Sequence, residues 1–249
     1  MLSDDDSTSA PRSGLVRRLK NFMMCLTRMG ASGPLHKEAG EQAEFSTGNK
    51  TSMKRTSAQN ASQLRIIGGA WRGRKLTFTE RPGLRPTGDR VRETLFNWLA
   101  PYLHGARCLD LFAGSGALGM EALSRGADHC EFVDSDRQAA ASLRANITAL
   151  DSDCPAARAQ VTLNNAQQFL STSSAEWHIV FVDPPFGQGL AEPALNQLID
   201  HHCLARDSWV YFETRQSQPE PIPEHRYTVH REKTAGDVLY RLLAPVDRN

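Results

Sequence analysis

The feature that most constrains the fold is an alternation of short apolar runs with helical stretches, which begins at residue 106. The apolar runs cover residues 106–112, 129–134, 159–164, 177–186 and 208–214, and the helical stretches cover 117–125, 136–150, 166–170 and 190–202. Apolar strands that alternate with helices indicate a parallel sheet with helices on both faces. Residues 225–244 break the alternation with two strand patterns around Gly236, which predicts an antiparallel hairpin at the sheet edge. The sequence therefore predicts an α/β fold.

A smaller unit precedes this series. The runs LRIIGG and RKLTF flank the turn-prone GGAWRGR, which predicts a small hairpin. TGDRVRETLFNWL then predicts a helix that Thr87 caps and Pro101 closes. We therefore expect a hairpin-and-helix region over residues 63–101 and a larger domain over residues 102–249.

Residues 1–62 have a different composition, rich in Ser, Thr, Gly, Ala, Asn and Gln and poor in aromatic residues. Such a segment buries too little apolar surface to offset its ordering entropy, so we expect a mostly disordered extension. Residues 14–30 could form a basic amphipathic helix, which leaves a targeting or membrane-surface role open. Met53 is an alternative start of the protein.

The five cysteines are widely scattered without a C-x-x-C motif, and the eight histidines, including His201 and His202 beside Cys203, show no metal-ligand spacing. This pattern predicts neither a zinc site nor a disulfide framework and fits a reducing compartment. No window approaches 18 uninterrupted apolar residues, so no membrane span is expected. We therefore expect a cytoplasmic protein with no metal site.

The stretch LDLFAGSGALGMEAL contains Gly114, Gly116 and Gly119 in the spacing G-x-G-x-x-G, between a predicted strand and a predicted helix. Glycines allow the backbone to approach a ligand closely, and a helix N-terminus favours polar or anionic groups. Asp134 follows Gly114 by 20 residues, where a carboxylate can bind both ribose hydroxyls. These features fit either a dinucleotide or S-adenosylmethionine.

Two features favour S-adenosylmethionine. Asp110 precedes the loop at a strand end, where a carboxylate opposes a diphosphate but can hold the ammonium group of methionine. No second glycine loop follows for the other half of a dinucleotide. We therefore interpret Gly114 and Gly116 as backbone room for the cofactor and Gly119 as a helix-packing residue, and expect Asp136 to cap the next helix.

The strand at residues 177–182 runs into Asp183, Pro184, Pro185 and Phe186. Two prolines fix the backbone, so the carboxylate and a peptide carbonyl can converge on one point beside an aromatic ring. This set suits a planar base with an exocyclic NH₂: two acceptors take its two hydrogens while the ring stacks on the base. Holding both hydrogens turns the nitrogen lone pair toward an electrophilic methyl group. The motif therefore predicts methylation of an amino group.

These motifs resemble those of class I S-adenosylmethionine-dependent methyltransferases, and DPPF resembles the D/N-P-P-Y/F motif of amino-group methyltransferases. The segments 65–76, 83–99, 110–127, 181–186 and 230–242 together resemble the RsmD-type family of bacterial 16S rRNA guanine-N2 methyltransferases. The resemblance covers residues 64–243 and does not extend to the N-terminal segment.

The resemblance implies a seven-stranded class I fold and methyl transfer to the N2 amine of one guanine in 16S rRNA. It also implies that protein-bound or partly assembled 30S particles are the substrate. The residues at the target base would be Asp183, Pro184, Pro185 and Phe186. The cofactor-binding residues would be Asp110, Ala113, Gly114, Gly116, Asp134, Ser135, Asn165 and Ala166, with Asn165 beside adenine where related enzymes often have Asp.

The hairpin-and-helix region is expected to bind RNA and to cover the cofactor. Residues 63–92 carry eight Arg and Lys against two acidic residues, a net charge of +6 in a chain whose net charge is +1. Such an excess beside a tryptophan suits phosphate contacts and stacking. The candidate RNA-binding residues are Arg65, Trp71, Arg72, Arg74, Lys75, Arg90 and Arg92. A solvated basic surface is the alternative, and Arg90 and Arg92 could instead face the cofactor pocket.

Three further functions stay open at this point. They are an amino-group methyltransferase acting on adenine in DNA or on another RNA, a dinucleotide oxidoreductase, and a catalytically silent RNA-binding factor. The missing second nucleotide half disfavours the oxidoreductase, and the intact DPPF disfavours the silent factor.

Overall fold

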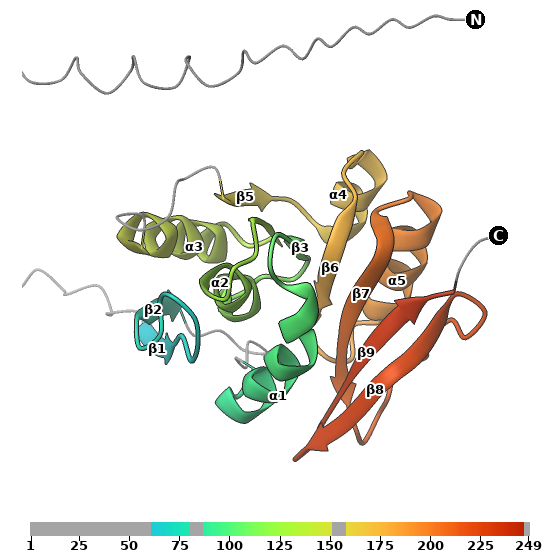
Figure 1. The fold of residues 1–249 in the computed structure, drawn as a ribbon. Coiled ribbons are helices and arrows are strands. Elements are labelled where there is room, and N and C mark those ends of the chain that lie inside the picture. Colours follow the sequence, from blue (N-terminus) through green and yellow to red (C-terminus); the bar gives the residue numbers. More distant parts are fainter. Residues whose placement is uncertain (1–60, 80–86, 151–157, 247–249) are drawn as a thin grey trace, which may run out of the picture. The chain divides into compact units, whose positions relative to one another are not determined.

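The elements of the chain follow the predicted alternation. The computed structural model describes residues 61–79, 87–150 and 158–246 (Figure 1). The N-terminal part contains β1 (Ala61–Arg65), β2 (Lys75–Thr79), α1 (Asp89–Leu99) and a short 3-10 helix (Ala100–Tyr102). The strands that follow are β3 (Arg107–Asp110), β4 (His129–Asp134), β5 (Ala159–Leu163), β6 (Trp177–Val182), β7 (Leu204–Arg215), β8 (Tyr227–Ala235) and β9 (Val238–Pro245). The helices between them are α2 (Ala117–Ser124), α3 (Arg137–Leu150), α4 (Ala166–Thr172) and α5 (Ala191–Asp200).

Seven of the strands form one sheet in the order β5-β4-β3-β6-β7-β9-β8. Strands β3 to β7 pair in parallel, whereas β9 pairs antiparallel with both β7 and β8. The predicted α/β sheet with an antiparallel edge hairpin is confirmed. The chain winds from β3 out to β5 and then crosses back to β6, so the strand order reverses beside β3. In such sheets ligands bind outside the carboxyl ends of the strands at this point.

Helices cover both faces of the sheet because successive residues of each strand point to opposite faces. Phe181 belongs to one buried cluster with residues of α1, α2 and α3, while its neighbour Val182 packs with residues of α4 and α5. Figure 1 shows α1, α2 and α3 on one side of the sheet and α5 on the other. Apolar burial on both faces explains why these strands are apolar throughout.

The small hairpin of β1 and β2 is stabilised by packing against the domain, since two strands alone are marginally stable. Asn146 of α3 accepts a hydrogen bond from the Thr77 backbone N–H at 3.1 Å and donates one to the Thr77 carbonyl at 2.9 Å. At the turn, a Cβ on Gly69 would lie 1.9 Å from the Ser124 carbonyl oxygen. Only glycine permits this close approach of the turn to the end of α2.

Two local predictions differ from the structure. Strand β1 begins at Ala61, which pairs with Thr79, so residues 61 and 62, which were predicted to belong to the extension, are part of the hairpin. Thr87 does not cap α1, whose N-cap is Gly88 without a side-chain hydrogen bond. The Thr87 hydroxyl donates instead to Oδ2 of Asp183 at 3.3 Å, because the chain enters α1 beside the end of β6. Residues 1–60 of the predicted extension 1–62 and the basic residues Arg81 and Arg85 lie outside the described residues.

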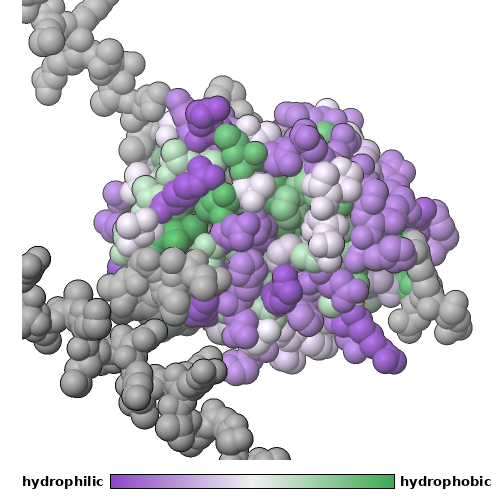
Figure 2. Space-filling view, turned by 90° about the horizontal axis from the view of Figure 1, so that it is seen from above, coloured by the Kyte–Doolittle hydropathy of each residue, from purple (hydrophilic) through white to green (hydrophobic). Residues whose placement is uncertain are grey.

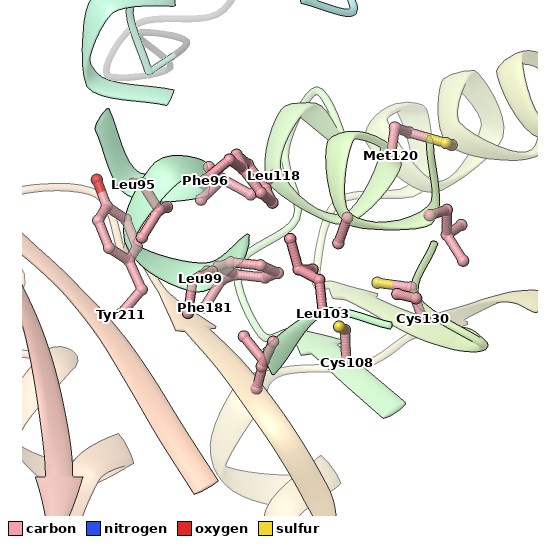
Figure 3. Close-up of a cluster of buried hydrophobic side chains, with 14 of the residues drawn as sticks. Leu95, Phe96, Leu99, Leu103, Cys108, Leu118, Met120, Cys130, Phe181 and Tyr211 are labelled. Carbon is pink, nitrogen blue, oxygen red and sulfur yellow. The ribbon is translucent and has the colours of Figure 1, made fainter. Parts of the chain in front are cut away.

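Within the described segments, no helix has the length and hydropathy needed to cross a bilayer. Hydrophilic residues occupy most of the face drawn in Figure 2, with smaller hydrophobic areas between them. The large apolar surface lies inside, between the sheet and its helices, as the cluster in Figure 3 shows.

Candidate active site

A pocket of about 810 Å³ opens at the carboxyl ends of the parallel strands. Its size is within the range of small-molecule sites. Eleven of the twelve predicted catalytic and cofactor residues line it: Asp110, Ala113, Gly114, Asp134, Ser135, Asn165, Ala166, Asp183, Pro184, Pro185 and Phe186. The structure therefore brings together three motifs that lie far apart in the sequence.

Gly116 is the predicted cofactor residue that does not line this pocket. Its φ of 77° is in the left-handed region, and a Cβ there would lie 2.4 Å from Cδ2 of Leu143. Glycine is therefore required for the turn and for packing against α3 rather than for room at the ligand. Gly114, with a φ of 51°, remains at the pocket wall.

Gly119 packs α2 against the sheet, as predicted, because a Cβ there would lie 2.3 Å from Cε1 of Phe132. It also has a role that the sequence did not reveal. Its backbone N–H donates to Oδ2 of Asp110 at 3.0 Å. The third glycine of the motif thus helps to position the acidic residue before the loop.

Asp110 is a buried carboxyl group in the pocket wall, with 2% of its surface exposed. Burial raises its pKa to about 7, the hydrogen bond from Gly119 opposes this rise, and the charge of Asp134 adds to it. A cation bound beside this carboxyl would favour its ionised form. The site therefore fits the ammonium group of the predicted cofactor.

Asp134 fixes the loops around it at the end of β4. Its Oδ2 accepts the Gly114 backbone N–H and its Oδ1 accepts the Asp136 backbone N–H, both at 2.8 Å. Each carboxylate oxygen can accept a second hydrogen bond, so Asp134 still has acceptor capacity for the ribose hydroxyls. Ribose binding by Asp134 stays a prediction. Asp136 caps α3 as predicted, since its Oδ1 accepts from Gln138 and Ala139.

Asn165 likewise fixes the backbone beside the pocket. Its side-chain oxygen accepts the Gln168 backbone N–H at 2.8 Å and so caps α4, while the residue lines the pocket. The predicted contact with adenine therefore involves a side chain whose orientation is already fixed by the helix cap.

Asp183 leaves the end of β6 into the pocket beside Pro184, Pro185 and Phe186. Burial raises the pKa of Asp183 well above its usual value, the charges of Glu213 and Asp110 add to the rise, and the Thr87 hydroxyl opposes it. The Phe186 ring faces the Arg215 guanidinium, which lies 5.6 Å from the ring centre. The motif thus presents an acceptor and an aromatic ring in one pocket.

Sequence reasoning missed Glu213, which also lines the pocket at the end of β7. The signal was present, because Glu213 is a lone acidic residue in the apolar run SWVYFET, as Asp110 and Asp183 are at their strand ends. It also missed Thr87 as a partner of Asp183, and Arg215 and Asp237 in the pocket wall.

The predicted RNA-binding residues divide into two groups. Arg65, Arg72, Arg74, Lys75 and Arg90 are exposed. The Arg74 guanidinium donates to the Ala149 carbonyl at 2.8 Å, and Arg90 lies at the pocket.

Trp71 and Arg92 are buried, with 4% and 1% of their surfaces exposed, so the prediction that they contact RNA is wrong for this conformation. Trp71 is part of the core that holds the hairpin turn to the domain. The Arg92 guanidinium instead donates to Asp89 at 2.5 Å and to the buried Glu121 at 3.5 Å. Nor does Arg92 line the pocket.

Comparison with known proteins supports the interpretation of this chain as a methyltransferase. The family model described as Conserved hypothetical protein 95 matches residues 64–244. Ribosomal RNA small subunit methyltransferase D of Escherichia coli (strain K12) is 48% identical over 190 residues, which are 76% of this chain and 94% of that protein.

The solved structure of a putative methyltransferase from Escherichia coli has a TM-score of 0.67 and 47% identity, covering 73% of this chain and 97% of that one. A putative SAM-dependent methyltransferase from Streptococcus mutans has a TM-score of 0.59 at 15% identity, covering 77% of this chain and 57% of that one. It shares the fold. These matches confirm the predicted fold class. They favour methyl transfer from S-adenosylmethionine over the oxidoreductase alternative.

Proposed function

We propose that this chain, which belongs to the Conserved hypothetical protein 95 family, methylates the N2 amine of one guanine in 16S rRNA, with S-adenosylmethionine as donor. The observation that carries the proposal is one pocket lined by both the glycine loop and the DPPF motif. The name of the relative from Escherichia coli supports small-subunit rRNA as the substrate. The resemblance of the sequence motifs supports the N2 amine of guanine as the methylated group.

We assign the half of the pocket at β3 and β4 to the cofactor. Asp110 would hold the methionine ammonium and Asp134 the ribose hydroxyls, while Gly114 leaves room for the backbone to approach. Asn165 lies where adenine would bind. When bound, S-adenosylmethionine supplies an electrophilic methyl group on a cationic sulfur.

The half of the pocket at β6 would hold the target base. The amine of guanine is a poor nucleophile because its lone pair is conjugated with the ring. Asp183 and a neighbouring peptide carbonyl would accept its two hydrogens and orient the lone pair toward the methyl group. Asp183 also stabilises the positive charge that develops on nitrogen. Phe186 offers a ring for stacking on the base.

The exposed basic residues of the hairpin would contact RNA phosphates. Arg65, Arg72 and Lys75 are exposed on the hairpin, and Arg90 at the start of α1 reaches the pocket. Exposed cations on the hairpin and one at the pocket suit a substrate that is a folded RNA whose target base must be drawn out of its stack. We propose small subunits or their assembly intermediates as that substrate.

Transfer of a labelled methyl group tests the proposal. Purified protein is incubated with labelled S-adenosylmethionine and small subunits from cells that lack the gene, and the rRNA is digested to nucleosides. Label in N2-methylguanosine is the expected result, with less label when naked 16S rRNA replaces the particles. Label in an adenosine product, or no label in rRNA, would contradict the proposal.

A further inference from the structure

Asp183, just after β6, and Glu213, near the end of β7, lie at neighbouring positions on the two strands. Strands β6 and β7 are parallel neighbours in which Val182 pairs with Phe212, so the next residues, Asp183 and Glu213, occupy equivalent positions. Side chains alternate along a strand, so Glu213 points to the face of Tyr211. Asp183 accepts a hydrogen bond from Thr87, which precedes α1 on that same face. Figure 3 shows Phe181 and Tyr211 together on the side of the sheet that α1 covers.

A hydroxyl group positions each of these carboxyl groups. The Tyr211 hydroxyl donates to Oε2 of Glu213, and the Thr87 hydroxyl donates to Oδ2 of Asp183. The Tyr211 ring is buried in the same apolar cluster as Leu95, which fixes the hydroxyl that holds Glu213 (Figure 3). Only 5% of the Glu213 surface is exposed, yet this residue lines the same pocket as Asp183 and Phe186. The pocket therefore contains a second rigid acceptor next to the DPPF motif.

Two neighbouring carboxyl groups in a buried wall disfavour each other's ionised form. The charge of Glu213 is indeed one of the causes that raise the pKa of Asp183. Such a pair is compensated best by a ligand that brings several N–H donors on one edge.

The edges of the bases differ in the number of such donors. Guanine has an N1–H beside its N2 amine, which gives three hydrogens on one edge. Adenine and cytosine have a lone pair on the ring nitrogen beside the amine. One acceptor serves the amine of any of these bases, but a second carboxylate beside it matches guanine and repels the ring nitrogen of the other two.

We propose that Glu213 accepts the N1–H of the target guanine while Asp183 accepts a hydrogen of its N2 amine. Glu213 thereby selects guanine over adenine at this site. This inference rests on the proposed function and assigns a base-recognising residue to it. Since β6 and β7 set the spacing of the two carboxyl groups, the selection is built into the sheet rather than into a loop.

The test uses a base analogue that lacks the hydrogen that Glu213 would accept. The modified guanine is first located by mapping the product of the wild-type protein. Small subunits are then assembled with rRNA that carries guanine or 2-aminopurine at that position. In 2-aminopurine the N2 amine is kept, but N1 has a lone pair and no hydrogen. The ratio of kcat/KM for the two substrates is measured for wild type and Glu213→Gln.

We expect wild type to favour guanine by at least about 10-fold, because the analogue offers a lone pair instead of a hydrogen to the Glu213 carboxylate. The amide of Glu213→Gln can donate to N1 of 2-aminopurine, so its ratio should fall by at least about 10-fold. The lost 6-oxo group is common to both measurements, so the difference between variants belongs to residue 213. Glu192→Gln, the same change on the exposed side of α5, should keep the wild-type ratio.

Equal activity of wild type on both substrates would overturn the inference without any variant. So would an unchanged ratio in Glu213→Gln protein with a wild-type melting temperature and cofactor affinity. Absence of guanine methylation by wild type would instead overturn the proposed function.

Discussion

Asp110 is the residue whose ionisation should control cofactor binding. Its pKa of about 7 in the free protein means that protonation competes with an ammonium ligand. The carboxyl is ionised above this pH, so affinity should be highest there and fall by up to about 10-fold for each pH unit below 7. Titration calorimetry with S-adenosylmethionine between pH 5.5 and 8 measures this slope.

Asp110→Asn is the matched variant for that measurement. It should bind the cofactor more weakly at pH 8 and show little pH dependence, because the amide does not titrate. A wild-type affinity that stays constant across this range would contradict the role of Asp110.

The same residue should lower the stability of the ligand-free protein. The pKa of Asp110 is raised on folding, so the folded state holds a proton that the unfolded state has lost between about pH 4 and 7. Unfolding free energy therefore decreases as pH rises through this window and stays lower above it. At pH 8, Asp110→Asn should be more stable than wild type by about 1–3 kcal/mol in urea unfolding. The explanation would be refuted if Asp110→Asn were less stable than wild type at pH 8 and its stability relative to wild type did not increase from pH 5 to pH 8.

The acidic site residues differ in how far the sequence could predict them. Asp110, Asp134 and Asp183 are recognisable because each ends an apolar strand or adjoins a motif of glycines or prolines. Glu213 lies near the end of such a strand too, but its place beside Asp183 depends on the pairing of β6 with β7, which residue patterns do not encode. Arg92 was misassigned because basic residues on a polar turn of helix are usually solvated, whereas a buried carboxylate partner lies on a distant element.

At the level of elements, Glu121 of α2 joins the hairpin region to the domain. It is fully buried and accepts hydrogen bonds from the Ile67 backbone N–H at 2.9 Å, from Arg125 at 2.7 Å and from Arg92 at 3.5 Å. Removing one partner of a buried ion pair leaves the other without compensation, so Glu121→Ala should cost about 3–5 kcal/mol of unfolding free energy.

The control is Glu93→Ala on the exposed side of α1, which should change stability by less than about 0.5 kcal/mol. Denaturant unfolding of both variants gives the comparison. Similar stabilities for Glu121→Ala and the control would show that this carboxylate does not join the two regions.

The hairpin itself should supply phosphate contacts. Arg72 and Lys75 are exposed, so their reversal to Glu should weaken RNA binding without unfolding the hairpin. The slope of log K against log salt should decrease by about 2, since about one counterion is released for each phosphate contact. Cofactor affinity should be unchanged. RNA affinity equal to that of wild type over several salt concentrations would favour a merely solvated basic surface.

At the level of the whole molecule, the sequence predicted the layers of the fold better than its arrangement. Burial on both faces requires strands that are apolar throughout, so the parallel sheet can be inferred directly from residues such as 177–182. The order β5-β4-β3-β6-β7-β9-β8 depends on how the layers pack, and it brings three separate motifs to one pocket. The closing of the small hairpin onto α2 depends in the same way on tertiary contacts such as that of Gly69 with Ser124.

The central claim is that this pocket methylates one guanine of the small-subunit rRNA. Its most direct test is mass spectrometric mapping of 16S rRNA from cells that lack the gene and from the same cells expressing wild type or Asp183→Ala at equal protein levels. One N2-methylguanosine should be absent without the gene, return with wild type and stay absent with Asp183→Ala. Persistence of every N2-methylguanosine of the small subunit in the cells without the gene would contradict the account.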